Sequence, residues 1–144
     1  MNTVSSILAR KGLSVLSVSP DTPVIEALRI MSDNNVGSVV VMQDGKYTGI
    51  MTERDYSRKV ALRGKSSADI QVGEIMSTDL PAVKPTDTVE HCMQLMSNKN
   101  IRYMPVFDGE KLLGIISISD VVKETILAQK ETIEQLHSFI QGNI

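Results

Sequence analysis

Residues 49–55, GIMTERD, return at residues 114–120 as GIISISD. The likeness extends outward from these two stretches without a gap, so that the whole of Val18–Asp55 can be laid onto Val83–Asp120. A repeat of this length is too short to bury both of its faces and normally stacks on its copy. The 144 residues therefore predict two similar halves sharing one compact core, and the space between the halves is a natural place for a ligand.

Both copies predict the same order of elements, β-α-β-β-α, and hence a mixed α/β fold. A short extended piece, at residues 16–19 or 82–84, precedes a helix in each copy. The helices are predicted because apolar residues follow the i, i+3, i+4, i+7 spacing that places them on one helical face. These residues are Val24, Ala27, Leu28 and Met31 in the first copy, and Val89, Cys92, Met93 and Met96 in the second.

The starts of these two helices carry their own signals. Thr22 before Pro23 suits an N-cap followed by proline at the first helical position, and Asp87 with Glu90 resembles a capping box. After each helix, two apolar runs surround an Asp-Gly pair, at residues 44–45 and 108–109, which is the signature of a β-hairpin. A further helix is expected to begin near Asp55 in the first copy and near Asp120 in the second.

The polar stretch RGKSSADIQ at residues 63–71 has the composition of a linker. We therefore predict a first repeat over residues 1–64, a linker over residues 65–71 and a second repeat over residues 72–144. The similar segments VSSIL near Val4 and VGEIM near Val72 predict a short leading helix in each repeat.

The final helix is expected to continue to about Ile140. Its apolar residues alternate spacings of four and three, with Gln129 in the missing place: Val122, Ile126, Ile133, Leu136 and Ile140. A stripe of this kind needs a partner. Two interpretations stay open, in which the helix packs on its own domain or pairs with a second copy of the chain.

Composition excludes several classes of function. Fifteen Lys and Arg against seventeen Asp and Glu give a net charge of −2, so no overall field favours nucleic acid or an anionic membrane. With no Trp and 3% aromatic residues, base stacking on the protein is disfavoured. One cysteine allows no internal disulfide, and no stretch has the apolar length of a signal peptide or a membrane span, so a cytoplasmic location is expected.

No catalytic or metal-binding constellation emerges from the sequence. His91 is interpreted as a surface residue and Cys92 as a small core residue, and adjacent helical side chains cannot jointly hold a metal. We therefore predict no metal and no enzymatic activity. A nucleotide-hydrolysing enzyme would need a general base or a metal cluster that the sequence does not supply.

The repeated motif itself has two interpretations. A hydroxyl residue followed three positions later by an acid is nearly a capping box, so Thr52 with Asp55 could serve only to start a helix. Alternatively, the carboxylate can accept hydrogen bonds from both hydroxyls of a ribose while the helix start faces phosphate. Five cations gather within a dozen residues there, which is either a solvated basic face or a means of neutralising phosphate: Arg54, Arg58, Lys59, Arg63 and Lys65.

The chain resembles the cystathionine-β-synthase (CBS) domain family, and specifically its small proteins built from one tandem pair. The resemblance rests on the two motifs, on the strand entries VGSVVV and IRYMPV, and on the longer string TERDYSRKVALRGKSS. The resemblance covers the chain from about Val4 to Gly142. It implies two pseudo-symmetric β-α-β-β-α repeats packed through their sheets, forming one regulatory module that binds adenine nucleotides in two clefts. In each cleft, the ribose-binding acid comes from one repeat and the strand that contacts the base from the other.

Carried over residue by residue, the resemblance assigns both clefts. The first would contain Thr52, Arg54, Asp55, Asp87, Ile101 and Tyr103, with Arg58, Lys59 and Lys65 as further phosphate contacts. The second would contain Thr22, Val36, Ser38, Ser117, Ser119 and Asp120. The clefts are expected to differ because Arg54 in one stands where Ser119 stands in the other, and because Asp87 would repel phosphate.

The leading hypothesis is a cytoplasmic homodimeric sensor that binds AMP or a related nucleotide (ADP, ATP or NAD(H)) and signals through dimer rearrangement or a regulated partner protein. The alternative is a dimeric interaction scaffold without a small ligand, in which Asp55 and Asp120 only cap helices. The two hypotheses differ in whether replacing these acids changes a nucleotide affinity or only the stability.

Overall fold

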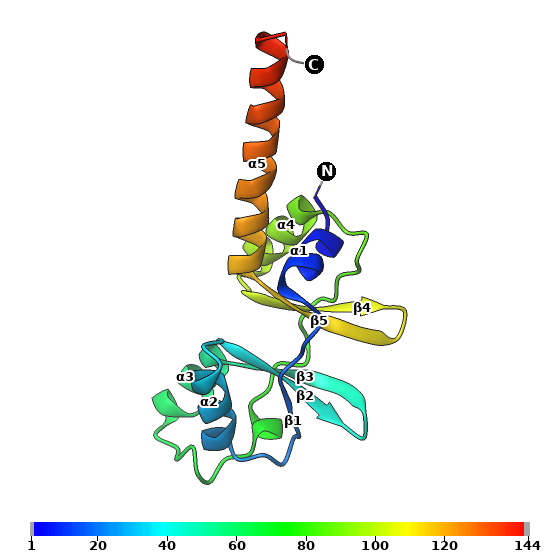
Figure 1. Cartoon of the computed structure of the whole chain (residues 1–144). Coiled ribbons are helices and arrows are strands. Elements are labelled where there is room, and N and C mark those ends of the chain that lie inside the picture. The colour runs from blue at the N-terminus through cyan, green and yellow to red at the C-terminus, as the bar shows by residue number, and fades with distance from the viewer. Residues whose placement is uncertain (1, 143–144) are drawn as a thin grey trace. The chain divides into compact units, whose positions relative to one another are not determined.

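The computed structural model describes residues 2–142 and divides the chain into two compact units. We call Ser14–Leu80 the central unit, and Met1–Leu13 with Pro81–Ile144 the terminal unit. Figure 1 shows the elements of each unit. The predicted mixed α/β fold and element order are confirmed, although the extended piece at residues 82–84 is reduced to one bridge, between Val83 and Val106.

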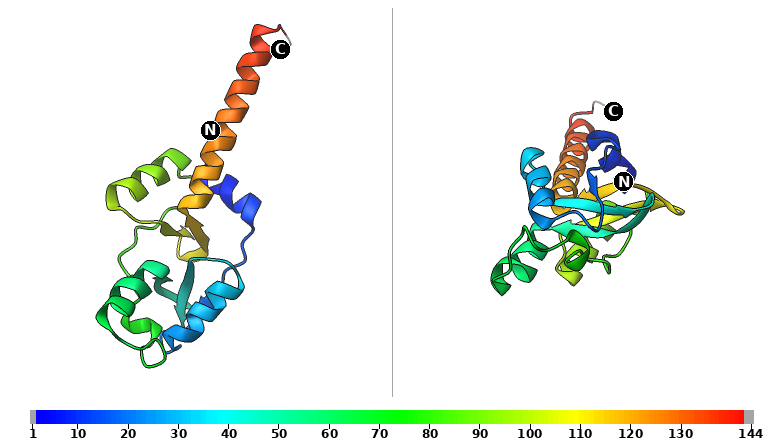
Figure 2. Two further views of the ribbon diagram at one scale, coloured as in Figure 1. Left: turned by 90° about the vertical axis from the view of Figure 1, so that its left-hand side faces the viewer. Right: turned by 90° about the horizontal axis from the view of Figure 1, so that it is seen from below.

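The central unit is built on a three-stranded sheet in the order β1-β2-β3. Strand β1 (Ser17–Val18) runs parallel to β2 (Ser38–Gln43) after the crossover helix α2 (Val24–Asp33), and β2 pairs antiparallel with β3 (Lys46–Thr52). Helix α2 lies on one face of the sheet, as Figures 1 and 2 show. The core forms where the apolar face of α2, including Ala27 and Met31, meets alternate strand residues such as Val39 and Val41.

The terminal unit repeats this plan on a hairpin of β4 (Tyr103–Asp108) and β5 (Lys111–Ser117). Helix α4 (Val89–Lys99) packs Cys92 and Met96 against the strand residues Met104 and Ile116, with Val4, Ile7 and Leu8 of α1 (Val4–Lys11) in the same core. Cys92 is completely buried, which confirms its interpretation as a core residue, and His91 is exposed as expected.

Helix α5 (Ile118–Ile140) ends where the sequence predicts. It packs against α1 and α4 near its start, and its later turns extend beyond both helices (Figure 1). The predicted stripe is exposed along the described helix, from 41% at Val122 to 81% at Ile140. The stripe therefore does not pack on its own unit, and the interpretation in which α5 packs this stripe on its own domain is wrong.

The compact units differ from the two repeats of the sequence, because each leading segment packs on the other repeat. Helix α1 belongs to the terminal unit, where Val4 N donates to Asp87 O (2.9 Å). In the same way, Val72 N donates to Thr22 O in the central unit (2.8 Å). A comparison of the two halves of the sequence does not reveal this exchange of leading segments, because the leading segment of each repeat packs on the other repeat. The outermost predicted ends, residue 1 and residues 143–144, lie outside the described residues.

The leading segments themselves differ. The first is the eight-residue helix α1, whereas the second forms only a 3-10 turn, η2 (Val72–Glu74). A further 3-10 turn, η1 (Ala61–Arg63), follows α3 (Glu53–Lys59). The predicted pair of leading helices is therefore correct for one repeat and wrong for the other.

Three predicted turns and caps are displaced by one residue. Helix α2 begins at Val24 with Pro23 as its N-cap, so Thr22 is not the cap. Helix α4 is capped by Thr88, whose Oγ1 accepts from His91 N (3.0 Å), while the Asp87 carboxylate accepts from Lys84 N (2.9 Å) in the preceding turn. In the second hairpin, the pairing of Asp108 with Lys111 leaves residues 109–110 as the loop, with the glycine first.

Candidate functional site

Asp55 lies at the start of α3, where β3 ends, and only 5% of it is exposed. Thr52 is the N-cap of the helix, and its hydroxyl accepts from Asp55 N (3.1 Å). In return, Asp55 Oδ2 accepts from Thr52 N and from Thr52 Oγ1, both at 3.0 Å. The predicted capping box is therefore present, and it fixes the orientation of the carboxylate.

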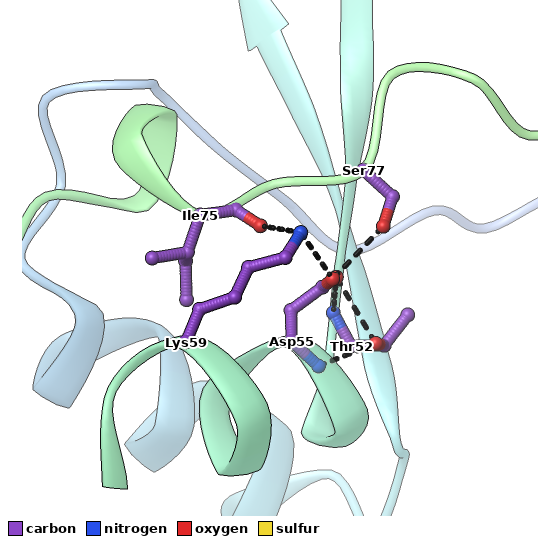
Figure 3. Close-up of polar contacts among 5 residues, drawn as sticks. All are labelled: Thr52, Asp55, Lys59, Ile75 and Ser77. Carbon is purple, nitrogen blue, oxygen red and sulfur yellow. Dashed lines mark hydrogen bonds and ion pairs between the residues drawn. The ribbon is translucent and has the colours of Figure 1, made fainter. Parts of the chain in front are cut away.

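The second carboxylate oxygen, Oδ1, accepts from Lys59 of the same helix and from Ser77 of a later segment (Figure 3). Lys59, one turn later on α3, donates from Nζ to Oδ1 and also to Ile75 O, each at 2.9 Å. Ser77 donates its hydroxyl to the same Oδ1 at 2.9 Å. This arrangement shows that Asp55 accepts from an alcohol as well as from an ammonium group. A ligand hydroxyl can bind there only by replacing one of these donors.

Asp120 occupies the equivalent position at the start of α5 but is more open, with 19% of its side chain exposed. Asp120 N donates to Ser117 Oγ (3.1 Å), and Asp120 Oδ2 accepts from Ser117 N (2.8 Å) and Lys11 Nζ (2.7 Å). Lys11 also donates to Ile115 O (2.8 Å), so that one lysine ties α1 to α5 and β5. Within residues 2–142, no hydrogen bond reaches Asp120 Oδ1.

Electrostatics favour the charged form of Asp120. Burial acts to raise its pKa, but the hydrogen bonds from Lys11 and Ser117 and the charge of Lys11 together outweigh burial, so the pKa lies below its ordinary value. The carboxylate is therefore an anionic acceptor at neutral pH, with one oxygen available.

A second carboxylate in the terminal unit serves a structural purpose. Glu124 on α5 is 1% exposed and receives both Arg10 Nε (2.8 Å) and Arg10 Nη2 (2.7 Å), a bidentate pair, with Asn2 as a further donor. The hydrogen bond from Arg10 has the largest effect on the pKa of Glu124 and lowers it. Burial acts in the opposite direction but does not cancel this effect, so the pKa lies below its ordinary value. Together with Lys11, Arg10 fastens α1 to α5.

The other predicted residues fall into the two units as follows. Ser38 pairs in register with Thr52 across β2 and β3, and Tyr103 pairs in register with Ser117 across β4 and β5. The central unit contains Thr22, Val36, Arg54, Arg58, Lys59 and Lys65. The terminal unit contains Asp87, Ile101 and Ser119. Each predicted cleft combines residues of both units, and that combination stays a prediction.

Two residues of these sites escaped the sequence reasoning. Ser77 reaches Asp55 from a segment 22 residues later, and Lys11 reaches Asp120 from 109 residues earlier. No local pattern signals either contact, because both depend on the exchange of the leading segments. Arg63 belongs to the basic cluster of the sequence but to neither predicted cleft. It lines a hollow with Lys59 and Lys65.

The residues from 2 to 142 contain no group of three or more His, Cys, Asp or Glu side chains that could hold a metal ion. Over the same described part of the chain, no helix is long and apolar enough to cross a membrane.

Comparison with known families decides the assignment of the fold. The CBS-domain family matches residues 4–62 and 72–126, so both repeats are recognised separately. The chain belongs to the CBS-domain family. It contains a tandem CBS pair, and such pairs are commonly regulatory modules and are typically non-catalytic.

Several CBS proteins are similar over most of this chain. The mitochondrial CBS domain-containing protein CBSX3 of Arabidopsis thaliana is 37% identical over 149 residues, which cover 97% of this chain and 72% of CBSX3. A CBS-domain protein from Burkholderia ambifaria MC40-6, described as a candidate signal-transduction protein, is 39% identical with a TM-score of 0.85. The match covers 89% of this chain and 96% of that one.

A second similar CBS structure is hexameric. This CBS-CP12 protein from bloom-forming cyanobacteria is 31% identical, with a TM-score of 0.74, over 83% of this chain and 66% of that one. Oligomers therefore occur among related CBS proteins. Inosine-5′-monophosphate dehydrogenase of Methanocaldococcus jannaschii also matches, but over only 21% of that enzyme.

Proposed function

We propose that this CBS pair is a sensor that binds an adenine nucleotide, with AMP as the first candidate and ADP, ATP or NAD(H) as related ligands. The observation that carries the proposal is the pair of carboxylates, Asp55 and Asp120, held at equivalent helix starts by their own capping boxes. Asp55 already accepts a hydroxyl group, which is the chemistry that a ribose requires. The family supplies the preference for adenine.

The two carboxylates differ in whether an oxygen is available to accept a further hydrogen bond. Both oxygens of Asp55 are engaged, whereas Asp120 offers Oδ1 and is more exposed. A ribose hydroxyl bound at Asp55 must displace Ser77 or Lys59, so part of its hydrogen-bond energy is offset. At Asp120 a hydroxyl can bind without displacing Lys11. We therefore expect the nucleotide to bind more tightly at Asp120 than at Asp55.

Calorimetric titration of nucleotide-free protein with AMP, ADP, ATP and NAD(H) tests the proposal. Asp120→Asn keeps the size of the side chain and should weaken the tighter site by about tenfold or more, since a charge-assisted hydrogen bond is worth about 1.5–3 kcal/mol. Asp108→Asn is the control in the same unit, because Asp108 is exposed at the end of β4. Absence of binding for all four nucleotides, or equal loss in the control, contradicts the proposal.

The scaffold alternative makes a different prediction for the same variants. If Asp55 only caps α3, Asp55→Ala lowers stability by about 0.5–2 kcal/mol and no nucleotide affinity exists to be lost. Melting curves with and without AMP separate the two hypotheses, because a ligand that binds only the folded protein raises the melting temperature.

The second part of the proposal is a homodimer formed through α5. Numbered as heptads, the exposed stripe places Ile126, Ile133 and Ile140 at position a, and Gln129 and Leu136 at position d. Isoleucine at a with leucine at d favours two parallel helices. The e positions carry Lys123 and Lys130, which would face one another in an antiparallel pair and repel. A parallel pair of α5 helices is therefore the favoured arrangement.

Sedimentation of two matched variants tests the dimer. Ile133→Glu places a charge in the stripe, where the wild-type residue is 65% exposed, and Gln135→Glu places the same charge on the exposed side of α5. Burial of one Ile per chain contributes about 1.5–3 kcal/mol, so Ile133→Glu should weaken a dimer by about 100-fold or more while the control is unchanged. A wild-type monomer, or equal behaviour of both variants, refutes this arrangement.

A nucleotide can shift this dimer, or a regulated partner protein, only by as much as it binds one arrangement better than the other. Sedimentation with saturating AMP is therefore expected to give a different dimer constant. The predicted compartment remains the cytoplasm, and because a relative is named as mitochondrial, cell fractionation is the direct test.

A further inference from the structure

A hollow of about 330 Å³ in the central unit adjoins the Asp55 site. It is lined by Lys59, Arg63, Lys65, Ile70, Glu74 and Ile75. Lys59 and Ile75 belong to both places, since Lys59 Nζ is hydrogen-bonded to Ile75 O and to Asp55. The hollow therefore lies beside the carboxylate and shares one cation with it.

The hollow has an excess of positive charge. Its only carboxylate among the described lining residues is Glu74, and Glu74 Oε2 is occupied by Gln71 N at 2.7 Å. Within residues 2–142, neither Arg63 nor Lys65 forms an ion pair with any carboxylate. Like charges gathered around one space repel, and an anion placed among them relieves the repulsion. The net charge of the whole chain is −2, so this positive excess is local to the hollow.

We propose that the hollow is a binding site for a small phosphate anion of the size of pyrophosphate. A planar guanidinium suits two phosphate oxygens at once, and an ammonium group adds a point charge. Arg63 and Lys65 supply these donors from the turn after α3, and the volume lies within the range of small-ligand sites. This assignment does not depend on nucleotide binding at Asp55.

Lys59 couples this anion site to Asp55. An anion in the hollow attracts Lys59 Nζ away from Asp55 Oδ1, and that oxygen then lacks one of its two donors. A ribose hydroxyl can take the vacated place without competing against the ammonium group. The anion and the nucleoside should therefore bind cooperatively, and each should raise the affinity of the other by the same factor. This coupling rests on the proposed function.

Titration with sodium pyrophosphate at constant ionic strength tests the anion site. The double variant Arg63→Gln with Lys65→Gln should bind pyrophosphate about tenfold more weakly or worse, since hydrogen bonds to charged groups are strong. The control is Arg29→Gln with Lys46→Gln, which removes the same charge from exposed positions of the central unit outside the lining. We expect this control to bind as wild type does. Non-saturable binding, or equal loss in both double variants, overturns the site.

Titration with AMP, with and without saturating pyrophosphate, tests the coupling. We expect AMP affinity to rise by about threefold or more, and Lys59→Met to abolish the rise. An unchanged AMP affinity overturns the coupling. Competition between the two ligands also overturns it and assigns the hollow to the nucleotide's own phosphate. If AMP does not bind while pyrophosphate does, the proposed function fails and the anion site stands.

Discussion

Replacement of Gly49 by alanine should disturb the Asp55 site through the backbone. An added Cβ at Gly49 would lie 2.7 Å from Ser77 O and 3.2 Å from Met76 Sδ. The methionine sulfur is at the end of a flexible side chain, but the carbonyl belongs to a segment paired with β3. Ile50 N donates to Ser77 O (3.0 Å) and Ser77 N donates to Ile50 O (2.8 Å). Relief of the clash therefore requires this pair of hydrogen bonds to lengthen.

The expected cost follows from these contacts. Overpacking of a well-filled site costs about 1–3 kcal/mol, and two weakened backbone hydrogen bonds add up to about 1 kcal/mol each. Alanine in a strand regains about 0.5–1 kcal/mol relative to glycine. A net loss of about 2 kcal/mol should lower the melting temperature by about 4–8 °C in a chain of this length.

The repeat provides a matched control for this prediction. Gly114 holds the same place in β5, and an added Cβ would meet only Leu8 Cδ2 at 3.5 Å, an ordinary contact. Gly114→Ala should therefore be neutral or slightly stabilising. Urea melts and the exchange rate of the Ser77 amide distinguish the two variants, because the displaced segment carries that amide. Equal stabilities of Gly49→Ala and Gly114→Ala would refute the reasoning.

Three further predictions concern titratable groups. The pKa of Glu124 is lowered in the folded protein, so its ion pair with Arg10 stabilises the fold fully above the ordinary pKa of a glutamate. This stabilisation is lost as the pH falls through the pKa of the folded state. The stability difference between wild type and Glu124→Gln, measured in urea, should therefore shrink below about pH 4.5. Lys11→Met should raise the pKa of Asp120 towards its ordinary value, as NMR titration of the carboxyl carbon would show, and an unchanged pKa contradicts the contact. Burial, with the nearby Asp87 charge, raises the pKa of Cys92 to about 11, so the thiol should react with iodoacetamide at pH 8 only after denaturation.

Local patterns in the sequence predicted the elements of each repeat well. The apolar spacing of α2 and α4, the Asp-Gly hairpin at residues 44–45 and the end of α5 at Ile140 all depend on neighbours within a few positions. The capping boxes at Asp55 and Asp120 were predictable for the same reason. Errors of one residue at Thr22 and Asp87 arose where two adjacent polar residues could each serve as a cap.

Contacts between distant segments could not be predicted in the same way. Lys11 with Asp120 and Ser77 with Asp55 join residues whose separation carries no periodic signal. The similarity of the two repeats does not tell which repeat each leading segment packs on, because similar leading segments can pack on their own repeat or on the other with the same sequence pattern. Exposure of the α5 stripe is likewise a property of the packed unit, and it rules out the interpretation in which the stripe packs on its own unit.

The exchange of leading segments has a consequence for folding during synthesis. The central unit is continuous in sequence and can complete its contacts soon after Leu80 has left the ribosome. The terminal unit cannot complete its contacts at that stage, because Val4 and Ser5 hydrogen-bond to Asp87 and Pro85. Arg10 likewise can form its ion pair only after Glu124 has been synthesised. Helix α1 is thus synthesised before the central unit but can pack only after residues 85–124 have been made. Until then its apolar face, with Ile7 and Leu8, is open to solvent and to chaperones, so a pause in translation before α5 is where this chain is most exposed to misassembly.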